Sequence, residues 1–213
     1  MKTQELIKLL ANGDIAVEPN AVPRRFALAL GWGACGAILL MAIWLGVRAD
    51  IAKAALLPMF WVKLAYPALI LAGALMAALR LSRPGVRLGR APLLIATPVL
   101  AMGLLAAAVL LSAAPGTHDR LIYGVSWTVC PFYIASLSAP VFVAALWAMQ
   151  GFAPTRPALA GASAGLLAGA AGALVYALYC PEMAAPFLAI WYLVGMLIPA
   201  VLGAVAGFML LRW

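Results

Sequence analysis

The chain has 213 residues, of which 67% are hydrophobic and 9% are charged, and its formal net charge is +8 at pH 7. A soluble domain of this size cannot bury so much apolar surface in one core, so most of that surface must face lipid. The apolar runs are long, continuous and rich in Ala, Leu and Gly, without the two-residue alternation of barrel strands. The composition therefore predicts an all-α, polytopic membrane protein.

The positive charge does not indicate direct nucleic-acid binding, because the basic residues occupy short connections between apolar runs, a pattern typical of membrane topology. The three cysteines form no Cys-x-x-Cys motif, which argues against a disulfide scaffold and the usual thioredoxin or zinc-ribbon signatures. The sequence has one histidine, no Ser/His/Asp set and no phosphate-binding glycine loop followed by Lys. We therefore expect neither an enzyme nor a required cofactor.

Residues 1–25 are the one sizeable polar piece, and they predict a short amphipathic helix rather than a cleavable signal peptide. Its apolar side consists of Leu6, Ile7, Leu9 and Leu10. A helix of about nine residues is marginal alone in water, so it needs a surface to lie against. Two interpretations stay open: the helix rests on the bilayer, or it docks on a cytoplasmic protein. Residues 21–25 are predicted to be a linker that ends in a membrane-edge anchor.

Six apolar runs follow, each near the roughly twenty residues needed to cross a bilayer, and together they predict a transmembrane domain over residues 26–213. We place them at about Phe26–Val47, Ala55–Leu79, Ala91–Ala113, Tyr123–Met149, Pro157–Tyr179 and Pro186–Leu211. Prolines within these runs are expected to kink their helices. They are Pro58, Pro67, Pro98, Pro140 and Pro199. Gly161, Gly165 and Gly169 form a surface of small residues that predicts close packing against a neighbouring helix.

The basic residues are distributed unequally between the two sides of the membrane. One side is predicted to hold Lys2, Lys8, Arg24, Arg25, Arg80, Arg83, Arg87, Arg90, Arg156 and Arg212, and the other Arg48, Lys53 and Arg120. Cytoplasmic loops carry the excess of Lys and Arg, so both termini are expected in the cytoplasm. The chain is predicted to reside in a bacterial inner membrane.

This topology places Cys130 and Cys180 at similar depth near the outer surface, at the ends of consecutive antiparallel helices, whereas Cys35 lies at the wrong depth. A close thiol pair there would form a disulfide or share a soft or heavy metal ion. Lys63 enters its span from the same side, and an ammonium near a thiol favours the thiolate. The open alternatives are two small buried apolar side chains and a lysine that extends to the interface.

Three further polar residues, His118, Asp119 and Glu182, are predicted in the outer loops. They would complete a coordination shell or remain ordinary solvated loop residues.

Several short stretches, taken in order along nearly the whole chain, are similar to one known family. They are residues 1–7 and 9–11, residues 23–25, Trp127, Cys130, residues 138–142 and 153–157, Gly161, residues 180–182 and 186–187, residues 191–192 and 195–196, and residues 211–213. On these residues the chain resembles the NrsF family of six-span bacterial inner-membrane anti-sigma factors.

The resemblance implies a regulator whose cytoplasmic N-terminal segment holds an extracytoplasmic-function sigma factor inactive. It implies that Leu6, Ile7, Leu9 and Leu10 face the sigma factor. It also implies that Cys130 and Cys180 perceive metal or redox stress, with the two sulfurs as metal ligands. Lys63 is a candidate from its depth alone.

Two other functions compete with the regulator. A small transporter or metal-efflux component would explain the prolines and Lys63, but it needs several polar residues near the bilayer midplane, and the spans are nearly bare of them. An accessory subunit that packs through its glycine surface is the second. The oligomeric state, the sensed ion or oxidant and the resting redox state of the thiols stay open.

Overall fold

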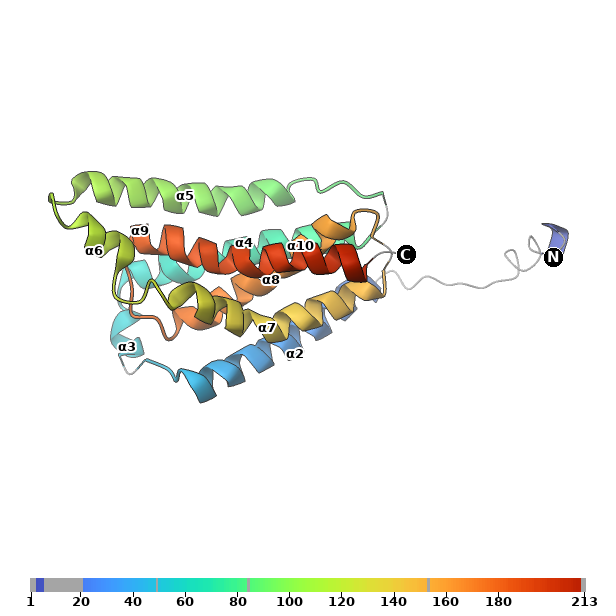
Figure 1. Ribbon diagram of the computed structural model, residues 1–213, viewed down its shortest axis with the longest axis horizontal. Helices are drawn as coiled ribbons and strands as arrows, with labels where there is room; N and C mark the ends of the chain where they lie inside the picture. Colours follow the sequence, from blue (N-terminus) through green and yellow to red (C-terminus); the bar gives the residue numbers. More distant parts are fainter. Residues whose placement is uncertain (1–2, 6–20, 49, 84, 153, 212–213) are drawn as a thin grey trace.

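The computed structural model describes the chain except for residues 1–2, 6–20, 49, 84, 153 and 212–213. Six long helices run side by side (Figure 1). They are α2 (Ala21–Trp44), α4 (Pro58–Leu81), α5 (Ala91–Ser112), α7 (Cys130–Gln150), α8 (Pro157–Ala177) and a last one built from α9 (Ala185–Phe187), the π-helical η1 (Leu188–Tyr192) and α10 (Leu193–Leu210). Two short helices, α3 (Ile51–Ala54) and α6 (His118–Tyr123), lie in connections. The predicted all-α fold with six candidate membrane spans is confirmed.

Two helix starts differ from the prediction. The fourth span begins at Cys130 rather than Tyr123, because Gly124 turns the chain with φ +52° and Pro131 then occupies the first turn of α7. Proline suits that position because the backbone amide it lacks has no partner in the first turn anyway. For the same reason residues 21–25, predicted as a linker, are the first turn of α2, which contains Pro23.

The prolines predicted within apolar runs fall into two groups. Pro58 opens α4 instead of interrupting it. The others lie inside helices, Pro67 in α4, Pro98 in α5, Pro140 in α7 and Pro199 in α10.

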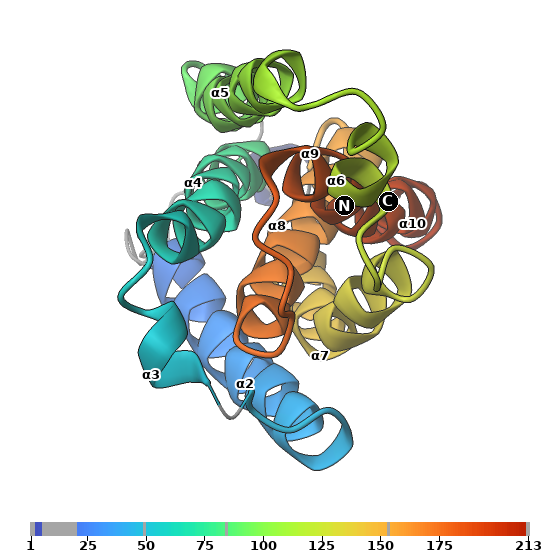
Figure 2. The same cartoon turned by 90° about the vertical axis from the view of Figure 1, so that its left-hand side faces the viewer.

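The glycine-rich α8 is the central helix of the bundle (Figure 2). In the membrane-spanning part of α8, 67% of the residues are buried inside the protein. The corresponding share is 17% for α5, which lies at the edge of the bundle and packs on α4. A Cβ added at Gly169 would lie 2.6 Å from the carbonyl oxygen of Met196 in α10. One added at Gly172 would lie 2.6 Å from the carbonyl oxygen of Ile134 in α7. The predicted small-residue packing surface is confirmed, since it brings α7 and α10 against the α8 backbone.

The two ends of the bundle carry different elements. The start of α2, the connection from α4 to α5, the connection from α7 to α8 and the end of α10 lie at one end, together with both chain termini (Figure 1). The opposite end carries α3, α6 and α9. This division follows the predicted alternation of basic residues, because α3 and α6 contain Lys53 and Arg120, whereas Arg83, Arg87 and Arg156 lie in connections at the end with the termini.

Candidate functional site

Cys130 and Cys180 lie in one buried cluster at the end opposite the termini. Cys130 is the first residue of α7, and its amide donates to the carbonyl of Ser126 at 2.9 Å. Cys180 follows α8, and its amide donates to the carbonyl of Tyr176 at 2.9 Å. Both thiols are free and fully buried, and both residues belong to the same apolar core. Cys130 at the start of α7 and Cys180 just after α8 therefore share one apolar environment.

Lys63 of α4 enters this cluster and is completely buried. Its Nζ donates to the carbonyl of Cys180 at 2.6 Å and to that of Glu182 at 2.9 Å. The two carbonyls hold the ammonium inside the protein. Two of its three N–H donors are satisfied in this way. The thiols of Cys180 and Cys130 are close enough to the ammonium to interact with it electrostatically.

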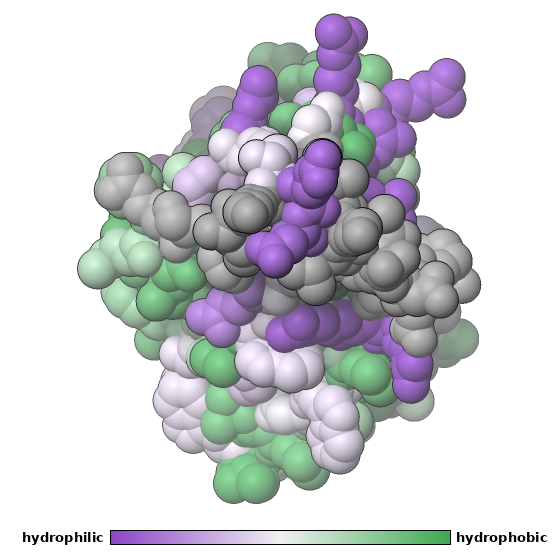
Figure 3. Space-filling view, turned by 90° about the vertical axis from the view of Figure 1, so that its right-hand side faces the viewer, coloured by the Kyte–Doolittle hydropathy of each residue, from purple (hydrophilic) through white to green (hydrophobic). Residues whose placement is uncertain are grey.

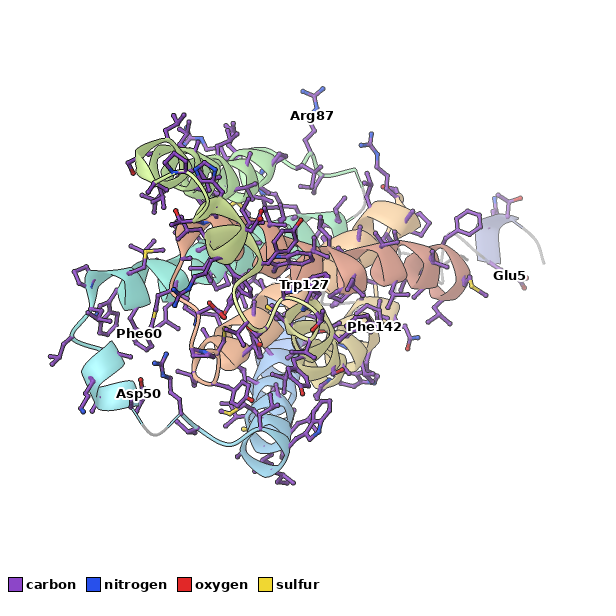
Figure 4. The ribbon with its side chains drawn as sticks, turned by 60° about the vertical axis from the view of Figure 1, so that its left-hand side comes forward. Glu5, Asp50, Phe60, Arg87, Trp127 and Phe142 are labelled. Atoms are coloured by element: carbon purple, nitrogen blue, oxygen red, sulfur yellow. The ribbon has the colours of Figure 1, made fainter. Side chains whose placement is uncertain are left out.

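A second cation reaches the same carbonyl from the connection between α2 and α3. Arg48 donates from Nη1 to the carbonyl of Cys180 at 3.3 Å, and its backbone amide donates to the carbonyl of Leu178 at 3.4 Å. Its guanidinium also binds both carboxylate oxygens of Asp50 at 2.6 Å. The hydrogen bond from Arg48 lowers the pKa of Asp50 below its ordinary value, and the same bond raises the pKa of Arg48. Figure 4 shows Asp50 beside α3, outside the helices.

Two buried tyrosines, Tyr176 and Tyr192, lie near the thiols, and a third, Tyr66, belongs to the same apolar core. Their hydroxyls make no well-formed hydrogen bond within the part of the chain that the structure describes. The hydroxyls of Tyr176 and Tyr192 are near enough to both cysteines to interact electrostatically. The Tyr192 ring centroid lies 5.7 Å from the Lys63 ammonium. The cluster thus contains polar hydroxyls with unused hydrogen-bonding capacity, which is uncommon in a buried site.

The connection between α6 and α7 closes over the cluster. The backbone amide of Val125 donates to Oε1 of Glu182 at 2.8 Å. The Trp191 indole donates to the carbonyl of Ile122 at 2.9 Å, and its ring lies 5.2 Å from that of Trp127. Trp127, labelled in Figure 4, precedes α7 at this end. These contacts tie the residues around both cysteines to α6 and η1.

Other candidate residues are not brought into the cluster. Cys35 is exposed on α2. His118 and Asp119 are exposed in α6, where His118 Nε2 lies 3.0 Å from the carbonyl oxygen of Leu110. Glu182 lies beside the cluster, but its carboxylate is bound to the Val125 amide. Among the described residues, no three His, Cys, Asp or Glu side chains are grouped as metal ligands.

The four apolar residues of the N-terminal segment, Leu6, Ile7, Leu9 and Leu10, lie outside the described residues. Residues 3–5, just before them, are helical and exposed.

A family described as NrsF, negative regulator of sigma F, matches residues 10–213. The chain is 53% identical over 213 residues to the "Probable anti-sigma-F factor NrsF" of Azospira oryzae, and the comparison covers all of both chains. It is 41% identical over 216 residues, again along all of both chains, to the "Anti-sigma-F factor NrsF" of Caulobacter vibrioides. This chain belongs to the NrsF family. No solved structure matches it.

Membership in the NrsF family confirms the resemblance and the expectation that the chain is a regulator and not an enzyme. The six apolar helices make it a multi-pass membrane protein.

Arg48 and the three tyrosines were missed by sequence reasoning. Arg48 was counted only as an outer-side cation, and its bond to a backbone carbonyl leaves no pattern in a sequence. Tyr176 offered a usable signal, because it stands one helical turn before Cys180 and thus shares its face.

Proposed function

We propose that this chain is an anti-sigma factor whose membrane bundle senses metal or redox stress at Cys130 and Cys180. Its relatives bear the name anti-sigma-F factor, which supports a sigma factor as the partner. That this partner is an extracytoplasmic-function sigma factor is part of the proposal. The observation that carries the sensor is the shared burial of both thiols with the Lys63 ammonium at one end of the bundle. The termini lie at the other end, where a cytoplasmic partner is to be held (Figure 1).

Two chemistries fit a pair of thiols. In the first, a soft ion displaces the two thiol protons and binds both sulfurs, as thiophilic metals prefer. With no third His, Cys, Asp or Glu grouped there among the described residues, a four-ligand zinc site is a poor fit, and a two-coordinate thiophilic ion is a better one. In the second, a peroxide accepts two electrons and the two thiol protons, the sulfurs join as a disulfide, and the peroxide leaves as two waters.

Lys63 supports either chemistry. Both require a thiolate, and a buried thiolate is costly unless a positive charge accompanies it. The Lys63 ammonium is already inside the cluster and is held by two carbonyls, one of which belongs to Cys180 itself. In our proposal Lys63 is a positioning residue that stabilises the thiolate and does not bind the signal.

The signal would travel along α7 and α2. Cys130 begins α7, and α7 packs against α2 with Gly33 of α2 so close that an added Cβ would lie 2.7 Å from Cα of Val141. At the end with the termini, Arg25 donates to the carbonyl of Trp147 at 3.0 Å, with its guanidinium 4.5 Å from the centre of the indole. A shift of α7 would move this contact, which lies just after the N-terminal segment.

The N-terminal segment is the proposed grip on the sigma factor. Leu6, Ile7, Leu9 and Leu10 form one apolar side, and a marginal helix gains stability by laying that side on a partner. The excess of basic residues at this end supports cytoplasmic termini and an inner-membrane location. The bilayer and the sigma factor are then the two partners, with no direct contact to nucleic acid.

A sigma-dependent reporter in cells tests this function. We expect Cys130→Ser/Cys180→Ser to keep basal repression and to lose the response to mercuric ions, which bind two thiolates linearly, and to peroxide. Cys35→Ser is the matched control, since Cys35 is an exposed cysteine outside the cluster, and it should respond as the parent chain does. A full response in the double variant would reject the sensor site.

The competing transporter function is not favoured by the buried residues. Among the described residues, the buried polar or charged side chains are Lys63, Ser82, Ser138 and Ser163. The three serine hydroxyls donate to carbonyls of their own helices. A transport path needs several polar groups free to bind a substrate near the midplane. The serines are already engaged, and the free hydroxyls of Tyr176 and Tyr192 belong to the cysteine cluster at one end of the bundle.

A further inference from the structure

The end of the bundle with the termini contains a basic pocket separate from the cysteine cluster. Its volume is about 400 Å³, and it lies between the connection from α4 to α5 and the start of α8. Its lining includes three arginines, Arg83, Arg87 and Arg156, together with Leu81 and Leu88. All three arginines are exposed, and no acidic side chain of the described residues lines the pocket.

The loop that carries two of these arginines is contacted by the last turn of α4. Arg80 donates from Nη1 to the carbonyl of Arg87 at 3.4 Å. Arg87 itself extends away from this loop (Figure 4). Hydrophilic side chains gather on the face at this end of the molecule, and apolar side chains lie mainly toward the rim of that face (Figure 3). The lining of the pocket thus combines cationic and apolar side chains.

An apolar groove continues from the pocket along the helices. It has a volume of about 540 Å³ and is lined by parts of α4, α5, α8 and α10, including Ile95, Ala96, Leu166 and Leu197. Leu81 and Leu88 line both the pocket and the groove, so the two hollows share a wall. The groove lies between α5, which packs on α4 and on α9, and the helices α8 and α10.

The position of the two hollows fits one kind of molecule. α4 ends at Leu81, α5 begins at Ala91 and α8 begins at Pro157, so the arginines lie just beyond the ends of spanning helices, at headgroup level. The groove lies beside the spans, at acyl-chain level. Basic pockets between transmembrane helices attract anionic lipid headgroups. An arginine guanidinium can donate two parallel hydrogen bonds to two oxygens of one phosphate group.

We propose that an anionic phospholipid binds here, with its headgroup among Arg83, Arg87 and Arg156 and one acyl chain in the groove between α5, α8 and α10. This lipid would fill the space that separates α5 from the rest of the bundle on that side. The site does not depend on the sensor or on the sigma factor, and it needs only that the chain spans a membrane.

Native mass spectrometry of the delipidated full chain in detergent tests the site. The probes are dioleoyl phosphatidylglycerol and dioleoyl phosphatidylcholine, which share acyl chains and differ in net charge. We expect the parent chain to prefer the anionic lipid by roughly tenfold or more at physiological ionic strength. Equal retention of the two lipids would overturn the proposal.

Two double variants separate the pocket from general basic charge. Arg83→Gln/Arg156→Gln should weaken phosphatidylglycerol binding by roughly thirtyfold, because each arginine near an anionic surface contributes a factor of roughly five. Arg24→Gln/Arg90→Gln removes the same charge from exposed positions at the same end, outside the pocket. It should weaken binding by less than about threefold. Equal losses in the two variants would mean unspecific attraction and would reject the site.

Two further arms test the acyl chain. Ala96 is exposed on α5 and lines the groove, so Ala96→Phe fills the groove without altering the core or the charge. We expect this variant to lose phosphatidylglycerol as strongly as the arginine variant does. Inorganic phosphate in large excess should leave the bound lipid in place. If phosphate displaces the lipid, or if Ala96→Phe binds it normally, the site recognises a phosphate group alone and the lipid proposal fails.

Discussion

The two ends of the bundle use basic side chains in opposite ways. At the end with the termini, Arg83, Arg87 and Arg156 are exposed around an open pocket. At the other end, Lys63 is completely buried and Arg48 is nearly so, and both donate to the carbonyl of Cys180. A cation that stays in water can meet a mobile partner, whereas a cation satisfied by backbone carbonyls fixes a local structure.

This difference explains why the two ends suit different tasks. The buried end holds two thiols and three tyrosines in a fixed, dry arrangement, so a chemical change there must alter packing. At the exposed end Arg83, Arg87 and Arg156 line an open pocket, which is suited to binding. A regulator that senses on one side and binds on the other requires this division, and the predictions that follow test it from the largest expected effect to the smallest.

The largest effect is expected from Lys63→Met, which keeps the length of the side chain and removes its charge. The carbonyls of Cys180 and Glu182 would lose the Lys63 donor, so we expect the free energy of unfolding to fall by about 2–4 kcal/mol. Thermal unfolding in detergent measures the change. The matched control is Lys53→Met in α3, an exposed lysine at the same end, where the change should stay within about 0.5 kcal/mol. If both variants melt alike, Lys63 does not hold this end together.

The next largest effect concerns α8, the central helix of the bundle. In Gly172→Ala the new Cβ would lie 2.6 Å from the carbonyl oxygen of Ile134 and 2.9 Å from the amide nitrogen of Ser138, so α7 must move off α8. We expect a loss of about 1–3 kcal/mol. Gly103→Ala in the peripheral α5 meets nothing within 4 Å and should be neutral or stabilising by up to about 1 kcal/mol. Thermal unfolding in detergent measures both changes. An unchanged free energy of unfolding in Gly172→Ala would contradict the close packing of α7 on α8.

The smallest effect is expected from Asp50→Asn, which removes the carboxylate that binds Arg48. Arg48 lowers the pKa of Asp50 below the ordinary 3.8, so the pair stabilises the fold above that value and this contribution is lost as pH falls through the lowered pKa. The parent and variant should therefore differ by the same small amount throughout pH 5 to 8, and their melting temperatures should converge only in stronger acid. If the difference in melting temperature between the parent and Asp50→Asn changed near neutral pH, a titratable group other than Asp50 would be responsible.

Several features could be predicted from the sequence because they depend on composition and spacing. The six spans follow from length and hydropathy, and the packing surface of α8 follows from the four-residue spacing of Gly161, Gly165 and Gly169. The shared depth of Cys130, Cys180 and Lys63 follows from counting alternate spans, and the structure places all three in contact with one buried region.

Other features depended on contacts that a sequence does not record. The role of Arg48 rests on a backbone carbonyl 132 positions away in the chain. The fourth span was placed too early, because Val125, Trp127 and Val129 are as apolar as a helix interior although they lie in a turn. Hydropathy could not predict that α8 is central and α5 peripheral, because both runs are apolar. The difference becomes visible in the close backbone contacts of the α8 glycines.

The most direct test of the central claim joins the two ends in one measurement. The full chain is reconstituted in lipid nanodiscs with its sigma factor, mercuric ions are added, and the sigma factor that stays bound is quantified. The account predicts release from the parent chain and from Cys35→Ser, and retention by Cys130→Ser/Cys180→Ser. Equal release from all three would contradict it, because the signal would then act without the cysteine pair.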